Sequence, residues 1–558
     1  MSWIPYNGEQ YLDFPSLKTW LEALVEAHSD WFRIMEIGQS RHGRPILLLT
    51  VGEQSGGISE RPAFWLDGGT HAAEWTGVMA CLHTLSRWAE RLAAGDEQTV
   101  SGFRQRTAYV VPCISPDGFQ ALCEGKPFLR STLRPPIGDQ HPVGLRPSDL
   151  TGDGSIRWMR WKHPAGPWVT DPDIPMWMRH RSLEDSPDEA YFFCSEGSFV
   201  NWDGVAWVDA PREFGVDLNR NFPGSWEPFR MFGMDGGTYP LSEPESRAVV
   251  DAVSARSNIA VALSNHTYTG CILCQPYRDP SPLSTSDIDL FESLATGAVA
   301  GTGYRVIKTH PDFVYDPKKA IVGVWSDTLS TTFGIPGYTL ELWNPYAFAG
   351  VEIENPAAFF RKPDPEVIKK MVAAFSSDAQ MVSDWVEVEH PQLGTVEVGG
   401  IDYMRTVRNP PPPLLPAEVA RGAVVADRMF ASTPQLHVEL RTRAESGVMI
   451  VDAVVENLGF LPTSASAYAE TLDLVSPIRV ELELGDGVEL VDGDLIQLLG
   501  HLDGWGSLQV GPSRHAIYPG LGPRGSRAKA RWVVRGSGEV AVQWASPRAG
   551  SGLEKRTI

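Results

Sequence analysis

AFWLDGGTHAAEWTGVMACLHTLSRWAERL, residues 63–92, is the stretch that decides the fold. It begins with the apolar run AFWL, which is typical of a short strand buried on both faces. From Trp75 to Leu92 the apolar residues recur at helical spacing. The stretch therefore predicts a buried strand, a turn and a helix in direct succession.

The same alternation of apolar runs and helical patterns extends along much of the chain. Further runs lie at 46–51, 109–111, 259–263 and 338–342, and a helical pattern covers 243–254. Strands that alternate with helices predict an α/β fold. In open α/β sheets the carboxyl ends of the strands carry the active site, so polar residues at those ends are the first candidates for function.

The length and the charge of the chain narrow its class. At 558 residues it is long enough for about two to four domains. The formal net charge of -21 opposes binding to nucleic acid or to an anionic membrane. No window reaches the roughly 18 apolar residues of a membrane span. Six cysteines and an N-terminus without a secretory signal pattern predict a cytoplasmic protein.

Composition shifts divide the chain into three parts. The first domain is expected at 8–395, with a long insertion at about 124–214 that is rich in Pro, Trp, Arg and Asp. An amphipathic helix is expected near 365–386. A linker and helix follow at 396–434, where four consecutive prolines form a stiff segment. Alternating runs bounded by turn residues predict an antiparallel β-sandwich at 435–550.

Three residues at predicted strand ends have the chemistry of a metal site. His71 and Glu74 follow the first strand, and a lone HxxE pair of this kind is more often a pair of surface helix residues. His266 follows the strand at 259–263, where a single histidine is more often structural. Together, two imidazoles and a carboxylate at one edge of a sheet are the ligands of a hydrolytic zinc site.

Charged residues that such a site needs also lie near strand ends. Glu341 stands inside the apolar strand YTLEL, where a carboxylate is costly to bury unless it is paired or functional. It is therefore the candidate general base. Arg130 and Arg220 are candidates for stabilising negative charge on an intermediate and for binding a substrate carboxylate.

Six segments in order resemble one known family. HAAE, SPDGF, FLRS, VDLNRNF, SNHTY and YTLEL occur in the order and approximate spacing of the zinc carboxypeptidases related to pancreatic carboxypeptidase A. The resemblance covers about 11 to 390. It implies a mixed twisted sheet flanked by helices, with one zinc ion per chain, and makes 8–395 the catalytic domain.

The resemblance also implies roles for individual residues. The zinc ligands are His71, Glu74 and His266; the glutamate that activates water is Glu341; the oxyanion-stabilising arginine is Arg130; the pair that grips the substrate's terminal carboxylate is Asn219 and Arg220. The partner it implies is a peptide with a free C-terminal carboxylate, with no nucleic acid and no membrane as partners.

Two positions depart from the family pattern. Where the family has a mobile tyrosine, the ungapped position is Lys319 and the nearest tyrosine is Tyr315. Ser326 aligns with the main selectivity position of the S1' pocket, beside Trp325. These two positions do not indicate whether the substrate's C-terminal side chain is basic, apolar or acidic.

Two short motifs have competing interpretations. SDLTGDGSI, with Asp149 and Asp153, imitates the first half of a calcium loop, but Arg160 stands where such a loop has its bidentate glutamate. Asp and Gly are also ordinary turn formers, so a plain turn is favoured. Cys271 and Cys274 have CxxC spacing, yet CILCQPY is typical of a buried strand with two buried thiols.

The sequence therefore predicts a zinc-dependent metallocarboxypeptidase with Glu341 as general base. One alternative is a zinc amidohydrolase that acts on small acyl-amino acids or on cell-wall peptides. An alternative from another class is a peptide-binding protein that has lost catalysis, and the presence of Glu341 with all three ligands argues against it.

Overall fold

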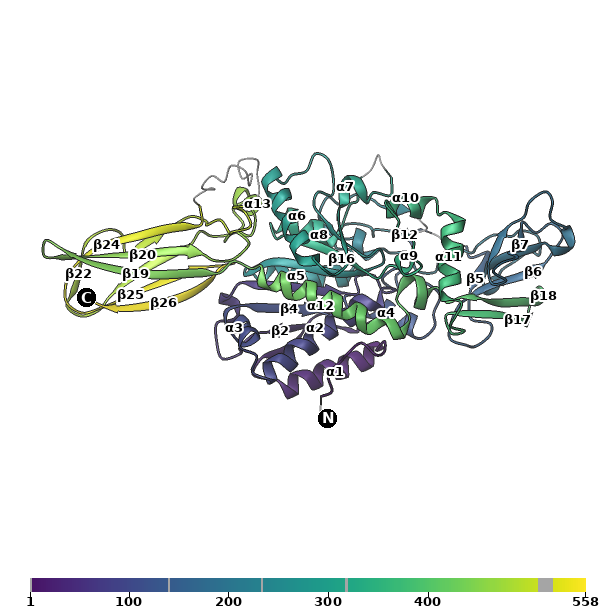
Figure 1. Cartoon of the computed structure of the whole chain (residues 1–558), viewed down its shortest axis with the longest axis horizontal. Helices are drawn as coiled ribbons and strands as arrows, with labels where there is room; N and C mark the ends of the chain where they lie inside the picture. Colours follow the sequence, from purple (N-terminus) through teal and green to yellow (C-terminus); the bar gives the residue numbers. More distant parts are fainter. Residues whose placement is uncertain (1–2, 139–140, 232–233, 317–319, 510–524) are drawn as a thin grey trace.

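The computed structural model describes residues 3–138, 141–231, 234–316, 320–509 and 525–558. Its centre is an eight-stranded sheet in the order β1-β2-β4-β3-β13-β16-β14-β15 (Figure 1). The strands are β1 (Phe32–Gln39), β2 (Pro45–Val51), β3 (Ala63–Gly68), β4 (Thr107–Val111), β13 (Ile259–Thr267), β14 (Cys271–Cys274), β15 (Arg305–Lys308) and β16 (Gly337–Leu342).

The sheet is mixed, as the family resemblance implied. Strands β4, β3, β13 and β16 run parallel to one another, whereas β1 and β2 at one edge and β14 beside β16 pair antiparallel. The parallel strands at the centre are continuous apolar runs because both of their faces are covered.

Helices bury the two faces of the sheet in separate apolar cores. Phe64 and Leu66 of β3 belong to one core, and Ala63 and Trp65 belong to the other, which is the two-residue period of a strand. The first core includes side chains of α1 (Phe14–Ala27), α2 (Trp75–Ala93), α6 (Thr285–Val299) and α12 (Leu415–Ala431). The second includes side chains of α5 (Pro244–Ser254) and α8 (Trp325–Thr332).

Smaller helices complete this part of the chain. They are α3 (Glu97–Gln105), α4 (Pro116–Cys123), α7 (Thr309–Asp312), α9 (Pro345–Phe348), α10 (Pro356–Arg361) and α11 (Pro365–Phe375). The helix expected near 365–386 is too long, because α11 ends at Phe375 and a strand begins at Val382. Among the described residues, no helix combines the length and apolar character needed to cross a membrane.

The segment at 124–214 builds most of a second sheet with the order β17-β18-β6-β9-β7-β8. Its strands are β17 (Val382–His390), β18 (Gly394–Ile401), β6 (Trp158–Lys162), β9 (Tyr191–Ser195), β7 (Trp168–Thr170) and β8 (Met178–His180). Two short antiparallel pairs are separate from it: β5 (Gly144–Pro147) with β10 (Gly197–Val200), and β11 (Arg230–Met231) with β12 (Met234–Asp235). The sheet projects from one end of the molecule (Figure 1).

The segment at 396–434 contains the expected helix, α12, but the rest of it is not a free linker. Most of β18 lies in it and pairs with β6, and α12 packs into the first apolar core through Val419, Val425 and Met429. Asp427 of α12 also accepts a hydrogen bond of 2.7 Å from the Trp88 indole of α2. Because its apolar stripe is buried against α2 and α6, α12 is part of the same core as the central sheet.

The C-terminal part is a sandwich of two antiparallel four-stranded sheets, as predicted, at the opposite end of the molecule (Figure 1). One sheet contains β19 (Leu436–Glu445), β20 (Val448–Asn457), β24 (Arg527–Gly536) and β22 (Val488–Asp492). The other contains β23 (Ile496–Leu498), β21 (Arg479–Leu484), β25 (Glu539–Ser546) and β26 (Gly550–Thr557), and α13 (Ala467–Thr471) lies in a connection. The Arg548 guanidinium donates to the carbonyls of Phe333 and Gly334, which ties the sandwich to the segment after α8.

Candidate metal centre

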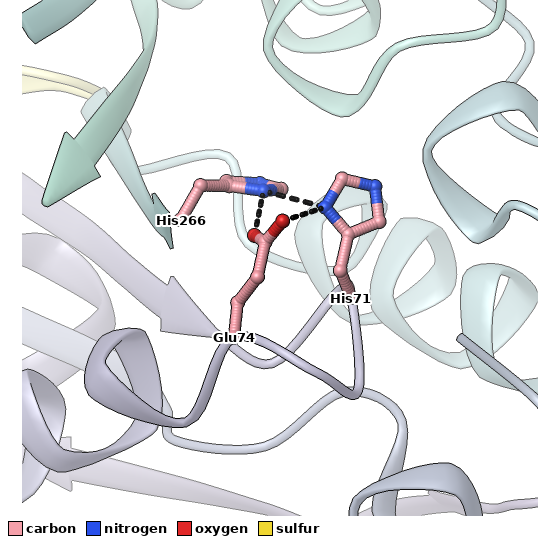
Figure 2. A group of neighbouring side chains, drawn as sticks. All are labelled: His71, Glu74 and His266. Carbon is pink, nitrogen blue, oxygen red and sulfur yellow. Dashed lines mark hydrogen bonds and ion pairs between the residues drawn. The ribbon is translucent and has the colours of Figure 1, made fainter. Parts of the chain in front are cut away.

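Three side chains from two strand ends converge on one point, as Figure 2 shows. Nδ1 of His71 lies 3.0 Å from a carboxylate oxygen of Glu74 and 3.0 Å from Nδ1 of His266. Nδ1 of His266 lies 2.9 Å from the other Glu74 oxygen. All three residues are buried. Among the described residues this is the one group of three or more such side chains close enough to hold a metal ion.

The topology explains why residues 195 positions apart meet. β3 and β13 are parallel neighbours, so their carboxyl ends lie at the same edge of the sheet. His71 and Glu74 occupy the turn between β3 and α2, and His266 is near the end of β13. Gly77 in the first turn of α2 permits this close approach, since a Cβ there would stand 2.6 Å from the Asn265 carbonyl oxygen.

Each histidine is oriented through its second ring nitrogen. Nε2 of His71 lies 3.2 Å from a carboxylate oxygen of Asp217, and Nε2 of His266 lies 3.2 Å from the Ser264 hydroxyl. Ser264 in turn donates to Asp67, which also accepts from the Trp325 indole at 2.7 Å. Such partners fix ring orientation and raise the basicity of a metal-ligating imidazole.

The donors fit zinc. Two imidazole nitrogens and one carboxylate oxygen, lying within 4.8 Å of one another, are the ligand type and number of a catalytic zinc site with one open position. Both outward nitrogens have hydrogen-bonding partners, so both Nδ1 atoms are directed to the shared centre. Burial opposes ionisation of Glu74, but His71 and Arg130 outweigh it and hold its pKa well below the ordinary value.

Glu341 lies beside this centre on the neighbouring strand. In the parallel register of β13 and β16 it pairs with His266, and its side chain lines a cavity. Burial, with repulsion from Glu74 as the second cause, raises the pKa of Glu341 to about 7. A strand that is otherwise apolar therefore presents one carboxylate to the cavity.

Arg130 bridges the two acidic residues around the histidines. Its Nη1 donates to Glu74 at 2.8 Å, and its Nε lies 3.6 Å from Asp217. Burial opposes the charge, but Glu74 and Asp217 outweigh it and raise the pKa of Arg130. The guanidinium is thus held at the metal centre and also lines the cavity.

Asn219 and Arg220 differ in their access to the cavity. The amide oxygen of Asn219 accepts a hydrogen bond of 2.8 Å from the Trp325 backbone N–H, and Asn219 is not among the cavity-lining residues. Arg220 lines the cavity, stacks over Phe229 and keeps a buried Nε that has no hydrogen-bond partner among the described residues. Burial opposes ionisation of Asp217, but Arg220 and then His71 lower its pKa.

The cavity beside the metal centre measures about 630 Å³. Aromatic residues form much of its wall: Phe128, Trp158, Phe229, Tyr268, Phe313, Tyr315, Tyr346, Phe359, Phe360 and Tyr403. Tyr315 is thus brought into the same space as Glu341 and Arg220, whereas Lys319 lies outside the described residues. Ser326 is fully buried and bonds to Tyr277 and Thr339, and it does not line the cavity.

The structure assigns structural roles to the SDLTGDGSI turn and to the Cys271–Cys274 pair. Asp149 accepts hydrogen bonds from the backbone N–H groups of Gly152 and Gly154, and Asp153 pairs with Arg157. These carboxylates therefore shape a turn, and calcium binding has no support among the described residues. Cys271 and Cys274 are buried thiols on β14.

Several functional candidates escaped the sequence interpretation. Asp217 stands two residues before Asn219 in VDLNRNF, and its position in that motif is a signal that was available. Arg408 gives no such signal, because it follows α11 and β17–β18 in a π-helical turn, Met404–Arg408. Its Nη1 nevertheless lies 3.4 Å from a Glu74 oxygen.

Comparisons with known proteins agree with this geometry. Residues 17–349 match the family model described as zinc carboxypeptidase, and residues 436–554 match a domain of unknown function (DUF8731). Carboxypeptidase B of Astacus astacus is 27% identical over 158 residues, which cover 28% of this chain and 47% of that protein. Carboxypeptidase B2 of Rattus norvegicus is 24% identical over 311 residues, covering 54% and 56%.

The chain spans about half the length of these curated relatives. Among solved structures, the thrombin-activatable fibrinolysis inhibitor matches with a TM-score of 0.41 and 19% identity, covering 67% of this chain and 76% of that one. Carboxypeptidase A from Helicoverpa armigera matches with a TM-score of 0.39 and 16% identity, covering 67% and 75%.

Proposed function

The chain belongs to the zinc carboxypeptidase family, and from this premise we propose that it hydrolyses the C-terminal bond of peptides that end in a free carboxylate. One observation carries the proposal. Glu341, Arg130 and Arg220 line a single cavity, and that cavity adjoins the His71, Glu74 and His266 centre. A base, a cation for an oxyanion and a cation for a terminal carboxylate are thus available to one substrate.

The ion would be held by His71, Glu74 and His266. When bound, zinc supplies Lewis acidity, which polarises a scissile carbonyl and lowers the pKa of a water to about 7. Glu341 accepts a proton from the attacking water and delivers it to the leaving amine, because its carboxylate is the one that β16 presents to the cavity beside His266. Asp217 and Ser264 keep both imidazoles in the required orientation.

Two arginines bind the negative charges of the substrate. Arg130 stabilises negative charge on the carbonyl oxygen, since its guanidinium is held at the centre by Glu74 and Asp217. Arg220 binds the terminal carboxylate, to which its unpartnered Nε can donate. The Asn219 oxygen accepts from Trp325 and the residue does not line the cavity, so of this pair Arg220 is the one that faces the carboxylate.

Digestion of a peptide library, read by mass spectrometry with zinc-loaded protein, tests the proposal. The expected result is the loss of single residues from free C-termini, abolished by a chelator and restored by added zinc. Peptides of a parallel library with amidated C-termini should not be cleaved. Internal cleavage, or equal cleavage of amidated peptides, would contradict exopeptidase action. Cleavage of acyl-amino acids alone would favour the amidohydrolase alternative.

A further inference from the structure

The cavity holds more positive charge than the proposed reaction uses. Arg130, Arg212, Arg220 and Arg408 line it, whereas Asp217 and Glu341 are its acidic residues. Arg130 and Arg220 have roles in the proposed function. Arg212 and Arg408 have none, and of the two Arg408 has an acidic neighbour, Glu74, whereas Arg212 has no ion pair among the described residues.

Arg408 reaches the metal centre from outside the segment that matches the family. Nη1 lies 3.4 Å from a Glu74 oxygen and 3.4 Å from the Thr267 carbonyl, and Nη2 lies 3.1 Å from the Tyr403 hydroxyl. Its side chain is 12% exposed, and its buried Nε has no hydrogen-bond partner among the described residues. A donor therefore stays uncommitted at the edge of the centre.

Arg212 and Arg408 form a pair around one aromatic ring. Their guanidinium carbons lie 5.6 Å and 5.5 Å from the centre of the Phe128 ring. Arg212 is exposed, and no ion pair within the described part of the chain includes it. Both guanidinium groups thus lie beside the same ring at the wall of the cavity, and Arg is the side chain best suited to bind a carboxylate.

A second cavity adjoins the first at Arg212. It measures about 670 Å³ and shares Phe128, Trp158, Arg212, Ile401 and Tyr403 with the first. Strands β5, β6 and β9 and the turn after β18 supply much of its wall, so it is built by the insertion and by the segment that follows the family match. Five basic side chains line it: Lys126, Arg146, Arg157, Arg212 and Arg405. Three carboxylates line it as well.

The two cavities give the direction of a bound peptide. Arg130 and Arg408 both contact the same carboxylate oxygen of Glu74 at the metal centre. Arg220 lines only the first cavity, whereas Arg212 lines both cavities, so a chain that leaves Arg220 can pass Arg212 on its way into the second. If Arg220 holds the terminal carboxylate, Arg408 and the second cavity lie on the acyl side of the scissile bond.

Resting on the proposed function, we propose that Arg212 and Arg408 bind a carboxylate on the acyl side, so that the enzyme selects peptides with an acidic residue upstream of the bond it cleaves. The upstream chain continues into the second cavity. An acidic side chain there meets two guanidinium groups, whereas its neutral amide counterpart leaves both charges unpaired.

Matched peptides test this selectivity. N-acetylated tetrapeptides carry Glu or Gln at each of the three positions upstream of the scissile bond, with a mixed C-terminal residue, and kcat/KM is measured for each. At one position or more, kcat/KM for the Glu peptide should exceed kcat/KM for the Gln peptide by about tenfold, which corresponds to about 1.4 kcal/mol. Equal values at all three positions would overturn the proposal.

The variants R212Q and R408Q assign the selectivity to the pair. Each should bring the Glu-to-Gln ratio close to one, whereas R33Q, the same charge change at an exposed residue of β1, should retain it. The exposed Arg212 provides a variant with little risk to folding. In the contrary outcome, R212Q and R408Q both keep the wild-type Glu-to-Gln ratio, which includes the case in which they lower kcat/KM equally for Glu and Gln peptides. Arg212 and Arg408 then do not select the carboxylate, and the proposal is wrong.

A binding measurement separates this inference from the proposed function. Zinc-loaded E341Q is titrated calorimetrically with the same Glu and Gln peptides. If the zinc-loaded wild type cleaves no peptide, while E341Q binds Glu peptides more tightly than Gln peptides and R212Q or R408Q abolishes this difference, the hydrolytic function is rejected and the acidic site is supported. Cleavage without a Glu preference in rate or in binding would reject the acidic site alone.

Discussion

Nε2 of His71 lies 3.2 Å from a carboxylate oxygen of Asp217, and both residues are almost completely buried. Asp217 also interacts with Arg130 and Arg220, so one carboxylate connects the metal centre with both arginines of the proposed reaction. It is a positioning residue, because it acts through His71 and does not itself offer an atom to the metal group.

D217N should weaken zinc binding by about 10- to 100-fold, because the neutral amide supports the His71 ring less strongly. Competition with a zinc-binding dye measures the affinity. D30N, the same change at an exposed residue, is the matched control. Zinc affinity equal to that of the wild type would show that the contact does not tune the ligand.

E341Q should leave zinc content unchanged and lower kcat by about 10²–10⁴-fold or more, because the amide cannot accept the proton of the attacking water. Metal analysis and peptide hydrolysis are measured on the same sample. Undiminished turnover by E341Q would refute Glu341 as the general base, since no other carboxylate of β16 faces the cavity in the described residues.

R220Q should lower kcat/KM for peptides with a free C-terminus by about 100-fold, the effect of losing a charge-assisted contact of about 2–3 kcal/mol. Residual cleavage of amidated peptides should change far less, so the preference for the free acid shrinks. R33Q serves as the control for net charge. A preserved preference in R220Q would place the carboxylate site elsewhere.

The stability of the protein should depend on pH through Glu245, near the N-terminus of α5. Glu245 is fully buried, one of its carboxylate oxygens has no hydrogen-bond partner among the described residues, and burial raises its pKa to about 7. The unfolded chain has an ordinary carboxyl pKa near 4.3. The native state therefore keeps a proton that the unfolded state loses between these values.

Glu245 thus contributes stability below pH about 4, and this contribution disappears as pH rises through 7. Relative to wild type, E245Q should gain about 1–3 kcal/mol between pH 5 and pH 8. Chemical unfolding of both proteins across this range measures the difference, with the exposed E26Q as control. A difference independent of pH would contradict the raised pKa.

Local patterns in the sequence were sufficient for the central strands β2, β3, β4, β13 and β16, but they did not predict β1 and β15. The apolar run at 63–66 and the helical spacing from Trp75 predicted β3 and α2, because strand and helix periods are visible in neighbouring residues. The same reasoning failed after Phe375, where β17 (Val382–His390) pairs with β18 instead of continuing the helix. Its partner strand lies outside the window in which a helical pattern is judged.

The sequence by itself determined the candidate metal ligands, the candidate base and the two candidate arginines, since each stands in a short motif that is visible in neighbouring residues. Only the tertiary structure decided which side chains support and surround them. Asp217 meets His71 across 146 residues, and Arg408 meets Glu74 across 334. Such contacts depend on the chain topology. They also depend on the insertion, whose strands join β17 and β18 in one sheet, so no local spacing encodes them.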